Sequence, residues 1–179
     1  GKDLAWKDFM EANFTGANLT ASNLRDTPFD KANLTNAKLD STGLYGTNFA
    51  EANLTGATFQ NASFFRNTVW PAGFSTVGKG MWGPKLDYSG QDLSGKDLAW
   101  KDFMEANFTG ANLTASNLRD TPFDKANLTN ANLSGAGLRG VNFLGANLTG
   151  VILTGARYTD STIWPEGFSI EGKGLIKEQ

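Results

Sequence analysis

Residues 11–20 have the sequence EANFTGANLT, and residues 51–59 return to it as EANLTGATF. In both stretches a Leu or Phe recurs every five residues, with a small residue two positions before it and usually Asn one position before it. An α-helix places apolar residues at a period of 3.6 and a strand at a period of 2. A period of five therefore predicts a repeat architecture in which short extended steps alternate with corners.

The central apolar residues form two series, each in unbroken five-residue register. The first series consists of Leu4, Phe9, Phe14, Leu19, Leu24, Phe29, Leu34, Leu39, Leu44, Phe49, Leu54, Phe59, Phe64 and Val69. The second consists of Tyr88, Leu93, Leu98, Phe103, Phe108, Leu113, Leu118, Phe123, Leu128, Leu133, Leu138, Phe143, Leu148, Leu153, Tyr158 and Ile163.

The pattern predicts that the central residue and the small residue before it point inward, while the other three positions face water. If four such steps close one square coil, neighbouring coils stack at the parallel-strand spacing of about 4.8 Å. Every fourth central residue then falls in one column. We expect one column of Phe9, Phe29, Phe49 and Val69, and a counterpart of Phe103, Phe123, Phe143 and Ile163.

These segments, together with GANLTG at 145–150, resemble the pentapeptide-repeat family, whose pattern is A-(N/D)-L-x-x. The resemblance implies an all-β fold, the right-handed quadrilateral parallel β-helix, here as two short solenoids in tandem. The right hand agrees with the general bias of parallel crossover connections.

The two series are out of phase because the second repeats the first at an offset of 94 residues, which is not a multiple of five. Residues 1–37 are identical to residues 95–131. This identity indicates a tandem duplication, of natural or engineered origin.

Each series ends at the motif Trp-Pro-x-Gly-Phe, which resembles the ending of cyanobacterial members of the family. An open coil exposes unpaired backbone and core, so we expect these residues to cap the solenoids. The predicted cap residues are Trp70, Phe74, Trp164 and Phe168. The predicted boundaries are a first solenoid with its cap at 1–74, a linker at 75–87, a second solenoid with its cap at 88–168 and a tail at 169–179.

The composition excludes most catalytic chemistry. The chain contains no His and no Cys, which removes imidazole bases, thiol nucleophiles and the usual zinc ligands. We therefore expect no enzyme, no cofactor and no metal site. A calcium ladder along the outward Asn residues is the alternative to a role in corner hydrogen bonding, which Asn favours. No run of about 18 apolar residues exists, so no membrane insertion is expected.

Several large apolar residues fall at outward positions, where polar residues are the rule. They are Trp6, Met10, Tyr45, Phe65, Trp100, Met104 and Leu144, with Trp82 in the predicted linker. Aromatic residues and Met are enriched in the centres of protein interfaces, so these residues are candidate partner contacts. The alternative is that Trp6 and Trp100 pack against a cap or linker.

Three functional classes follow from these patterns. The first is a rigid scaffold or linker that presents a surface to a protein partner, with a photosynthetic assembly as the setting that the cyanobacterial resemblance suggests. The second is a DNA-mimic modulator of gyrase, a role that the resemblance implies only for strongly acidic relatives, whereas the net charge here is -2. The third, an enzyme, is disfavoured. No direct nucleic-acid binding is expected at this charge, and the expected location is the cytoplasm, with thylakoid association as the alternative.

Overall fold

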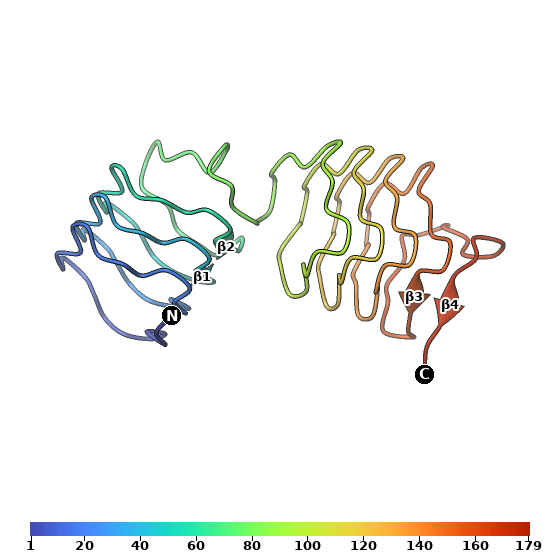
Figure 1. The fold of residues 1–179 in the computed structure, drawn as a ribbon, viewed down its shortest axis with the longest axis horizontal. Coiled ribbons are helices and arrows are strands. Elements are labelled where there is room, and N and C mark those ends of the chain that lie inside the picture. The colour runs from blue at the N-terminus through green and yellow to red at the C-terminus, as the bar shows by residue number, and fades with distance from the viewer. The chain divides into compact units, whose positions relative to one another are not determined.

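The computed structural model describes residues 1–179 and contains strands but no helix (Figure 1). No segment forms a helix that is long and apolar enough to cross a bilayer. The chain divides into two compact units, Gly1–Gly83 and Pro84–Gln179. The regular strands are β1 (Gly43–Leu44), β2 (Ser63–Phe64), β3 (Arg157–Tyr158) and β4 (Ile176–Lys177).

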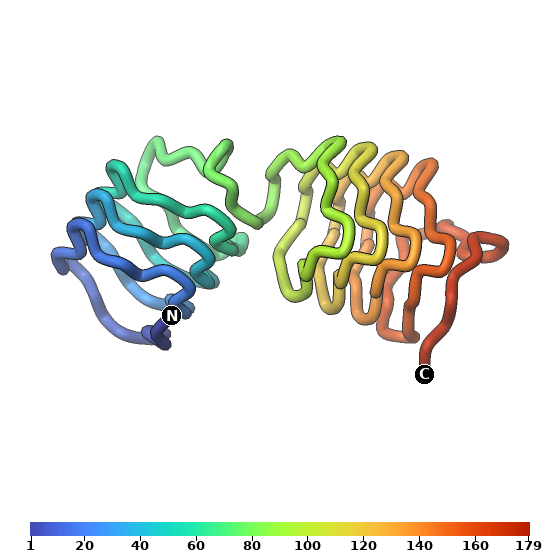
Figure 2. The backbone as a smooth tube through the Cα atoms, viewed as in Figure 1, coloured from blue at the N-terminus to red at the C-terminus, as the bar shows by residue number.

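Coils stack through parallel pairing of residues that lie 20 positions apart. Asn33, for example, bridges both Asn13 in the preceding coil and Asn53 in the following one. The N–H of Phe14 donates to the Asn33 carbonyl at 2.7 Å, and the Asn33 N–H donates to the Ala12 carbonyl at 2.9 Å. Within one coil the bridging positions recur every five residues, which gives four sides per coil (Figure 2). Each unit is therefore a four-sided parallel β-helix.

The predicted inward residues form the core. Ala32, Leu34, Ala131 and Leu133 are all fully buried. Rings in the Phe column stack directly, and Phe29 and Phe49 have centroids 5.5 Å apart with nearly parallel planes. Burial of each large side chain contributes about 1.5–3 kcal/mol in transfer terms. Since this gain recurs in every coil, the stack is stabilised by its repetition.

Corners are tight turns in which the second residue after the centre has a left-handed backbone. Ala21 has a φ of 57° and Lys125 has a φ of 57°. The bond that closes such a turn runs from the Ser22 N–H to the Leu19 carbonyl at 3.1 Å. Positive φ at this position is the signature of a type II turn.

Where an Asn precedes a centre, its side chain holds the following corner. The Thr15 N–H donates to Asn13 Oδ1 at 3.0 Å, and the same geometry recurs at Asn33, where the Thr35 N–H donates at 3.1 Å. The amide oxygen thus binds backbone two residues further on, which is the Asx-turn behaviour of Asn. Of the two predicted roles for these residues, corner hydrogen bonding is the one that the geometry displays.

A Thr at the small inward position donates a hydrogen bond from its hydroxyl group to the backbone. Thr47 Oγ1 donates to the carbonyl of Leu24 at 2.8 Å, and Thr121 Oγ1 donates to the carbonyl of Leu98 at 3.1 Å. Both Thr side chains are fully buried. A buried hydroxyl without a partner would cost free energy, so this bond to the preceding coil explains why the core accepts Thr.

The prediction that Val69 and Ile163 are inward centres is wrong. Both are exposed, with 47% and 50% of their surfaces accessible. Val69 bridges Asn48 and Ile163 bridges Asn142, so each occupies the outward position normally held by Asn. Trp70 takes the place assigned to Val69: its ring stacks on Phe49 at 5.3 Å and 14°.

The register shifts because the preceding corner contains one extra residue. Six positions separate Phe64 from Trp70, where five separate other centres. The wider corner closes with paired bonds, from the Thr68 N–H to the Phe65 carbonyl at 3.0 Å and from the Phe65 N–H to Thr68 Oγ1 at 3.1 Å. Thr68 is buried and takes the small inward position. The second unit repeats this corner at Thr159 and Thr162.

After each Trp-Pro-x-Gly-Phe motif the chain returns to the last coil and pairs with it. In the first unit the Asn61 N–H donates to the Gly80 carbonyl at 2.7 Å, and Ser63 of β2 bridges Trp82. In the second unit β4 pairs in parallel with β3, and Lys177 Nζ lies 2.6 Å from Asp160 Oδ1. This contact raises the pKa of Lys177 through a hydrogen bond and through charge attraction. Residues 80–82 of the predicted linker thus lie against the first coil stack.

We predict that Ala131→Leu destabilises the protein by about 1–3 kcal/mol, because the inward position has no room for three further carbons. Thr149→Leu introduces the same side chain at an exposed outward position and should change stability by less than about 0.5 kcal/mol. Urea unfolding of both variants measures the difference. Equal effects of the two substitutions would contradict the inward placement of Ala131.

A pH prediction follows from two corners that carry Asp at the position where Asn is the commonest residue. The Ser89 N–H donates to Asp87 Oδ1 at 3.0 Å, and this bond lowers the pKa of Asp87. The Ser94 hydroxyl and N–H lower the pKa of Asp92 in the same way. Because both folded-state pKa values lie below the unfolded ones, their contribution is present above the ordinary Asp pKa and is lost as the pH falls through the folded values.

We therefore expect the double variant Asp87→Asn/Asp92→Asn to lose less stability than the parent when the pH falls from about 5 to about 2. Asn keeps the acceptor oxygen but does not titrate. Thermal unfolding across this range gives the comparison. Identical pH profiles would show that the two carboxylates contribute nothing to the corners.

Candidate interaction surface

The predicted contact residues divide between the two units. Trp6 and Met10 are 70% and 50% exposed, and Trp100 and Leu144 are 61% and 57% exposed. The remaining candidates, Tyr45, Phe65, Trp82 and Met104, are partly buried. Two groups emerge from this placement, one on each unit.

On the first unit, Tyr45 and Phe65 form a ridge along one corner. Their rings meet edge to face with centroids 4.6 Å apart. The Arg25 guanidinium lies 4.5 Å from the Tyr45 ring centroid, and Arg25 also pairs with Asp26 at 3.2 Å. The cation–π contact and the ring pair stabilise this arrangement. Because these residues cover one another, they leave little apolar surface for a partner.

Trp6 and Trp100 occupy the second corner position, where the backbone is left-handed. Their φ values are 62° and 63°. This conformation is an outlier for a bulky residue, although every type II corner of the coil requires it. The Arg119 guanidinium lies 5.8 Å from the Trp100 ring centroid. Both indoles otherwise project from the coil, and the structure does not bring either one together with the other candidates.

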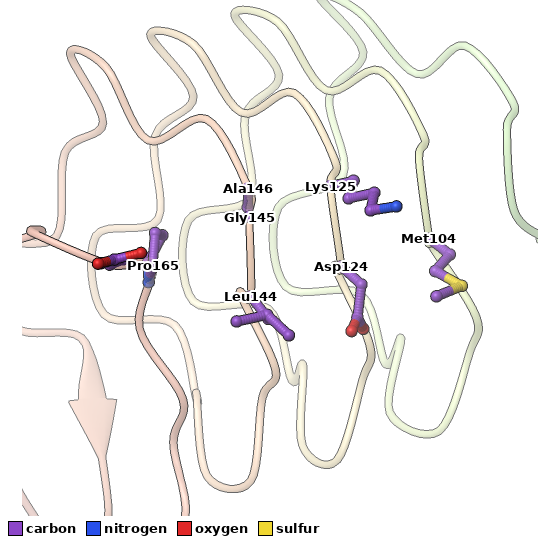
Figure 3. Close-up of a pocket in the computed structure, with 8 residues that line it drawn as sticks. Met104, Asp124, Lys125, Leu144, Gly145, Ala146 and Pro165 are labelled. Carbon is purple, nitrogen blue, oxygen red and sulfur yellow. The ribbon is translucent and has the colours of Figure 1, made fainter.

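On the second unit, Met104 and Leu144 lie in a shared groove with a volume of about 400 Å³ (Figure 3). The groove crosses successive coils of one face. Its lining residues are Met104, Asp124, Lys125, Leu144, Gly145, Ala146, Pro165 and Glu166. Met104, Asp124 and Leu144 follow one another at 20-residue intervals and therefore stand in one outward column.

Hydrogen bonds fix the residues of this column. The Leu144 N–H donates to Asn142 Oδ1 at 2.9 Å, and Asn142 Nδ2 donates to Asp124 Oδ1 at 2.8 Å. One Asn side chain thus sets the positions of the exposed Leu144 and of the neighbouring carboxylate. The groove is preformed rather than dependent on a partner to order it.

Gly145 keeps the groove open. A Cβ atom at this position would lie 3.4 Å from Lys125 Cγ, and the backbone there has a φ of 68°. The alkyl stem of Lys125 therefore runs beside Gly145 and forms part of the apolar wall, while its ammonium group remains at the rim.

The first unit does not reproduce this groove chemistry, although it shares most of the sequence. Ala50, Glu51 and Ala72 stand at the positions equivalent to Leu144, Gly145 and Glu166. The exposed Leu of this column is therefore a property of the second unit, whereas Met10, the twin of Met104, is exposed in the first unit. The two units thus share the inward pattern but differ at these outward residues.

Sequence reasoning found Met104 and Leu144 but missed Asp124, Lys125 and Pro165. The sequence does contain a signal for Asp124, because a 20-residue period places it between Met104 and Leu144 in one column. Lys125 is the next residue in the chain. Pro165 could not be found in this way, since the extra residue before Trp164 shifts the register by one. The structure groups no three His, Cys, Asp or Glu residues in a way that could hold a metal ion.

Each predicted cap residue extends an aromatic stack. Trp70 lies between Phe49 and Phe74, with centroid distances of 5.3 and 4.8 Å. In the second unit Trp164 lies 5.3 Å from Phe143 and 5.6 Å from Phe168. Lys79 and Lys173 place their ammonium groups over Phe74 and Phe168 at 4.9 and 5.0 Å. Their capping role stays a prediction, and this geometry is what supports it.

Comparison with known proteins agrees with the coil geometry. A family model described as pentapeptide repeats matches eight copies, in residues 8–44, 32–66, 89–120 and 116–155. The chain belongs to the pentapeptide-repeat family. The predicted fold class, the right-handed quadrilateral β-helix, is thereby confirmed. No catalytic family is indicated by these matches, and no curated protein matches the chain.

Similar solved structures are also pentapeptide-repeat proteins. One from the Arabidopsis thaliana thylakoid lumen is 37% identical over 51% of this chain and 61% of its own, with a TM-score of 0.43. One from Nostoc is 31% identical over 51% of this chain and 84% of its own, with a TM-score of 0.41. HetL, a Nostoc protein involved in heterocyst differentiation regulation, is 28% identical over 86% and 73%, with a TM-score of 0.30.

Proposed function

We propose that this protein is a non-catalytic interaction module whose second unit binds a protein partner through the groove around Leu144. The observation that carries the proposal is a Leu that is 57% exposed and lines a groove of about 400 Å³ together with Met104. An exposed Leu beside a partly buried Met in one concave site is unusual on a surface whose outward positions are mostly polar. Such a site favours a partner that contributes an apolar side chain.

The shape and charge of the groove define the kind of partner. Met104, Leu144 and Pro165 offer apolar contact, while Asp124, Lys125 and Glu166 place both signs of charge around it. A short protein segment with one or two apolar anchors fits this arrangement, because apolar contact supplies affinity and the charged rim supplies orientation. A small polar metabolite would leave the apolar lining unused.

The scaffold is suited to presenting a fixed surface. Parallel backbone bonds join each coil to the next, and Asn142 holds both Leu144 and Asp124 in place. A preorganised site loses little conformational entropy when a partner binds. We propose a scaffold or linker role within a larger assembly. The photosynthetic setting rests on the resemblance of the Trp-Pro-x-Gly-Phe motif to that of cyanobacterial members.

Exchange of groove residues for those of the first unit tests the proposal. Leu144→Ala and Gly145→Glu introduce the residues that occupy positions 50 and 51, so the fold has already accommodated them. We expect each variant to weaken binding of a captured partner by at least about tenfold, through loss of the anchor contact or obstruction of the groove. The measurement is affinity capture from the native cell, followed by titration of the purified partner against each variant.

The matched control is Thr149→Ala, which alters an exposed corner residue outside the groove lining. It should leave the dissociation constant unchanged. A partner that binds the parent, both groove variants and the control with equal affinity would contradict the assignment of this groove.

A further inference from the structure

Each coil stack ends in a backbone edge that its own cap leaves unpaired, and in the second unit this edge lines a cavity. The cavity has a volume of about 410 Å³ and lies between the last coil and the cap, where Leu148, Gly150, Phe168 and Lys173 line it. We call it the cap cavity. It adjoins the groove around Leu144 but has its own set of hydrogen-bonding groups.

Within the stack, three backbone bonds join successive coils on this face. The Leu128 N–H donates to the Asn147 carbonyl at 2.9 Å, and the Asn130 N–H donates to the Thr149 carbonyl at 2.8 Å. In the other direction the Asn147 N–H donates to the Ala126 carbonyl at 2.9 Å. Each coil therefore needs two carbonyls and one N–H from the next coil, supplied by residues two positions apart in an extended chain.

The last coil presents the same three groups without a partner for them. The N–H groups of Leu148 and Gly150 donate to no atom of the protein, and the Ala146 carbonyl accepts no hydrogen bond. The chain that follows the cap pairs only further along, where the Gly155 N–H donates to the Gly174 carbonyl at 2.7 Å. Leu148 is only 6% exposed. Because an unpaired backbone group at a buried position costs free energy, this edge favours an extended chain that supplies the missing groups.

A cation stands beside the edge. Lys173 places its ammonium group 5.0 Å from the Phe168 ring centroid and forms no ion pair within the protein. Glu166 also lines the cavity, but Ala72 takes its place in the first unit. The unpaired ammonium group favours an occupant that brings a negative charge to the end of the edge.

The first unit repeats this arrangement. The N–H groups of Leu54 and Gly56 and the carbonyl of Ala52 are likewise unpaired. Lys79 places its ammonium group 4.9 Å from the Phe74 ring centroid. One chain thus carries the same edge and the same cation twice.

We propose that this edge binds the carboxyl terminus of a partner polypeptide in an extended conformation. Two residues before its end, the partner donates an N–H to the Ala146 carbonyl and accepts the Leu148 N–H. Its terminal carboxylate accepts the Gly150 N–H and pairs with Lys173. The residue between them faces Phe168, which already covers the core, so it is Gly or Ala. Strand addition to a sheet edge supplies the backbone bonds, and capture of the carboxylate selects the chain end.

The test adds the tripeptide acetyl-Asn-Ala-Thr, with a free terminal carboxylate, to the full-length protein. Asn and Thr copy the residues that make these bonds within the stack. We expect saturable changes in the NMR shifts of the Leu148 and Gly150 amides, and of the Leu54 and Gly56 amides in the first unit. The same tripeptide with an amidated end should bind at least about fivefold more weakly. Acetate at the same concentration should leave the Leu148 amide unchanged.

The two units provide matched controls for each other. Lys173→Met keeps the alkyl stem, and it should weaken binding at Leu148 and Gly150 at least about fivefold without affecting the first unit. Lys79→Met should do the reverse. Leu144→Ala should leave both sites unchanged, because that side chain lines only the neighbouring groove.

Unchanged shifts of all four amides at about 10 mM tripeptide would overturn the proposal. Equal binding of the amidated tripeptide would also overturn it, since the carboxylate would then not be recognised. Acetate that shifts the same amides as strongly would show a simple anion site with no role for a peptide backbone. Loss of tripeptide binding in Leu144→Ala would move the binding site to the groove.

Discussion

The width of the square coil interior is the constraint on which the rest of this structure depends. Each side admits one small and one large inward side chain, and backbone bonds to the next coil hold that width at every level. Ala32 and Leu34 are fully buried in this interior, and Thr47 fits because its hydroxyl donates a hydrogen bond to the preceding coil. Neither helix propensity nor strand alternation is needed. A core this narrow fixes the five-residue period and leaves three outward positions free to vary.

That freedom explains how one scaffold acquires two surfaces. The units share the inward pattern but differ at outward positions, where Tyr45 and Phe65 form a ridge on one unit while Leu144 and Gly145 shape a groove on the other. Outward substitutions cost little stability because they leave the core untouched. The residues that determine folding therefore lie inside the coil, and the outward residues are free to differ between the two units.

The inward pattern was predictable from sequence because each inward residue is one of many equivalent copies. The prediction was wrong at Val69 and Ile163, where a six-residue corner moves Trp70 and Trp164 into the column. Val is as apolar as a true centre, so periodicity alone could not reveal the extra residue. Thr68 was a usable signal, since it stands two positions before Trp70 as a small residue should.

Individual surface residues could be predicted from the sequence, but their grouping in space could not. Met104 and Leu144 stood out as apolar residues at polar positions, whereas the groove depends equally on Gly145, which has no side chain to attract attention. Such features depend on which segments become neighbours in space.

Cross-linking across adjacent coils tests the central claim most directly, since the chain has no Cys. A Thr129→Cys/Thr149→Cys variant joins positions 20 residues apart in one outward column, where parallel strands lie about 4.8 Å from each other. Under mild oxidation we predict rapid disulfide formation in the folded protein. A Thr129→Cys/Thr154→Cys variant, whose cysteines lie on different sides of the coil, should not cross-link. Efficient cross-linking of the second pair and not of the first would contradict the twenty-residue coil.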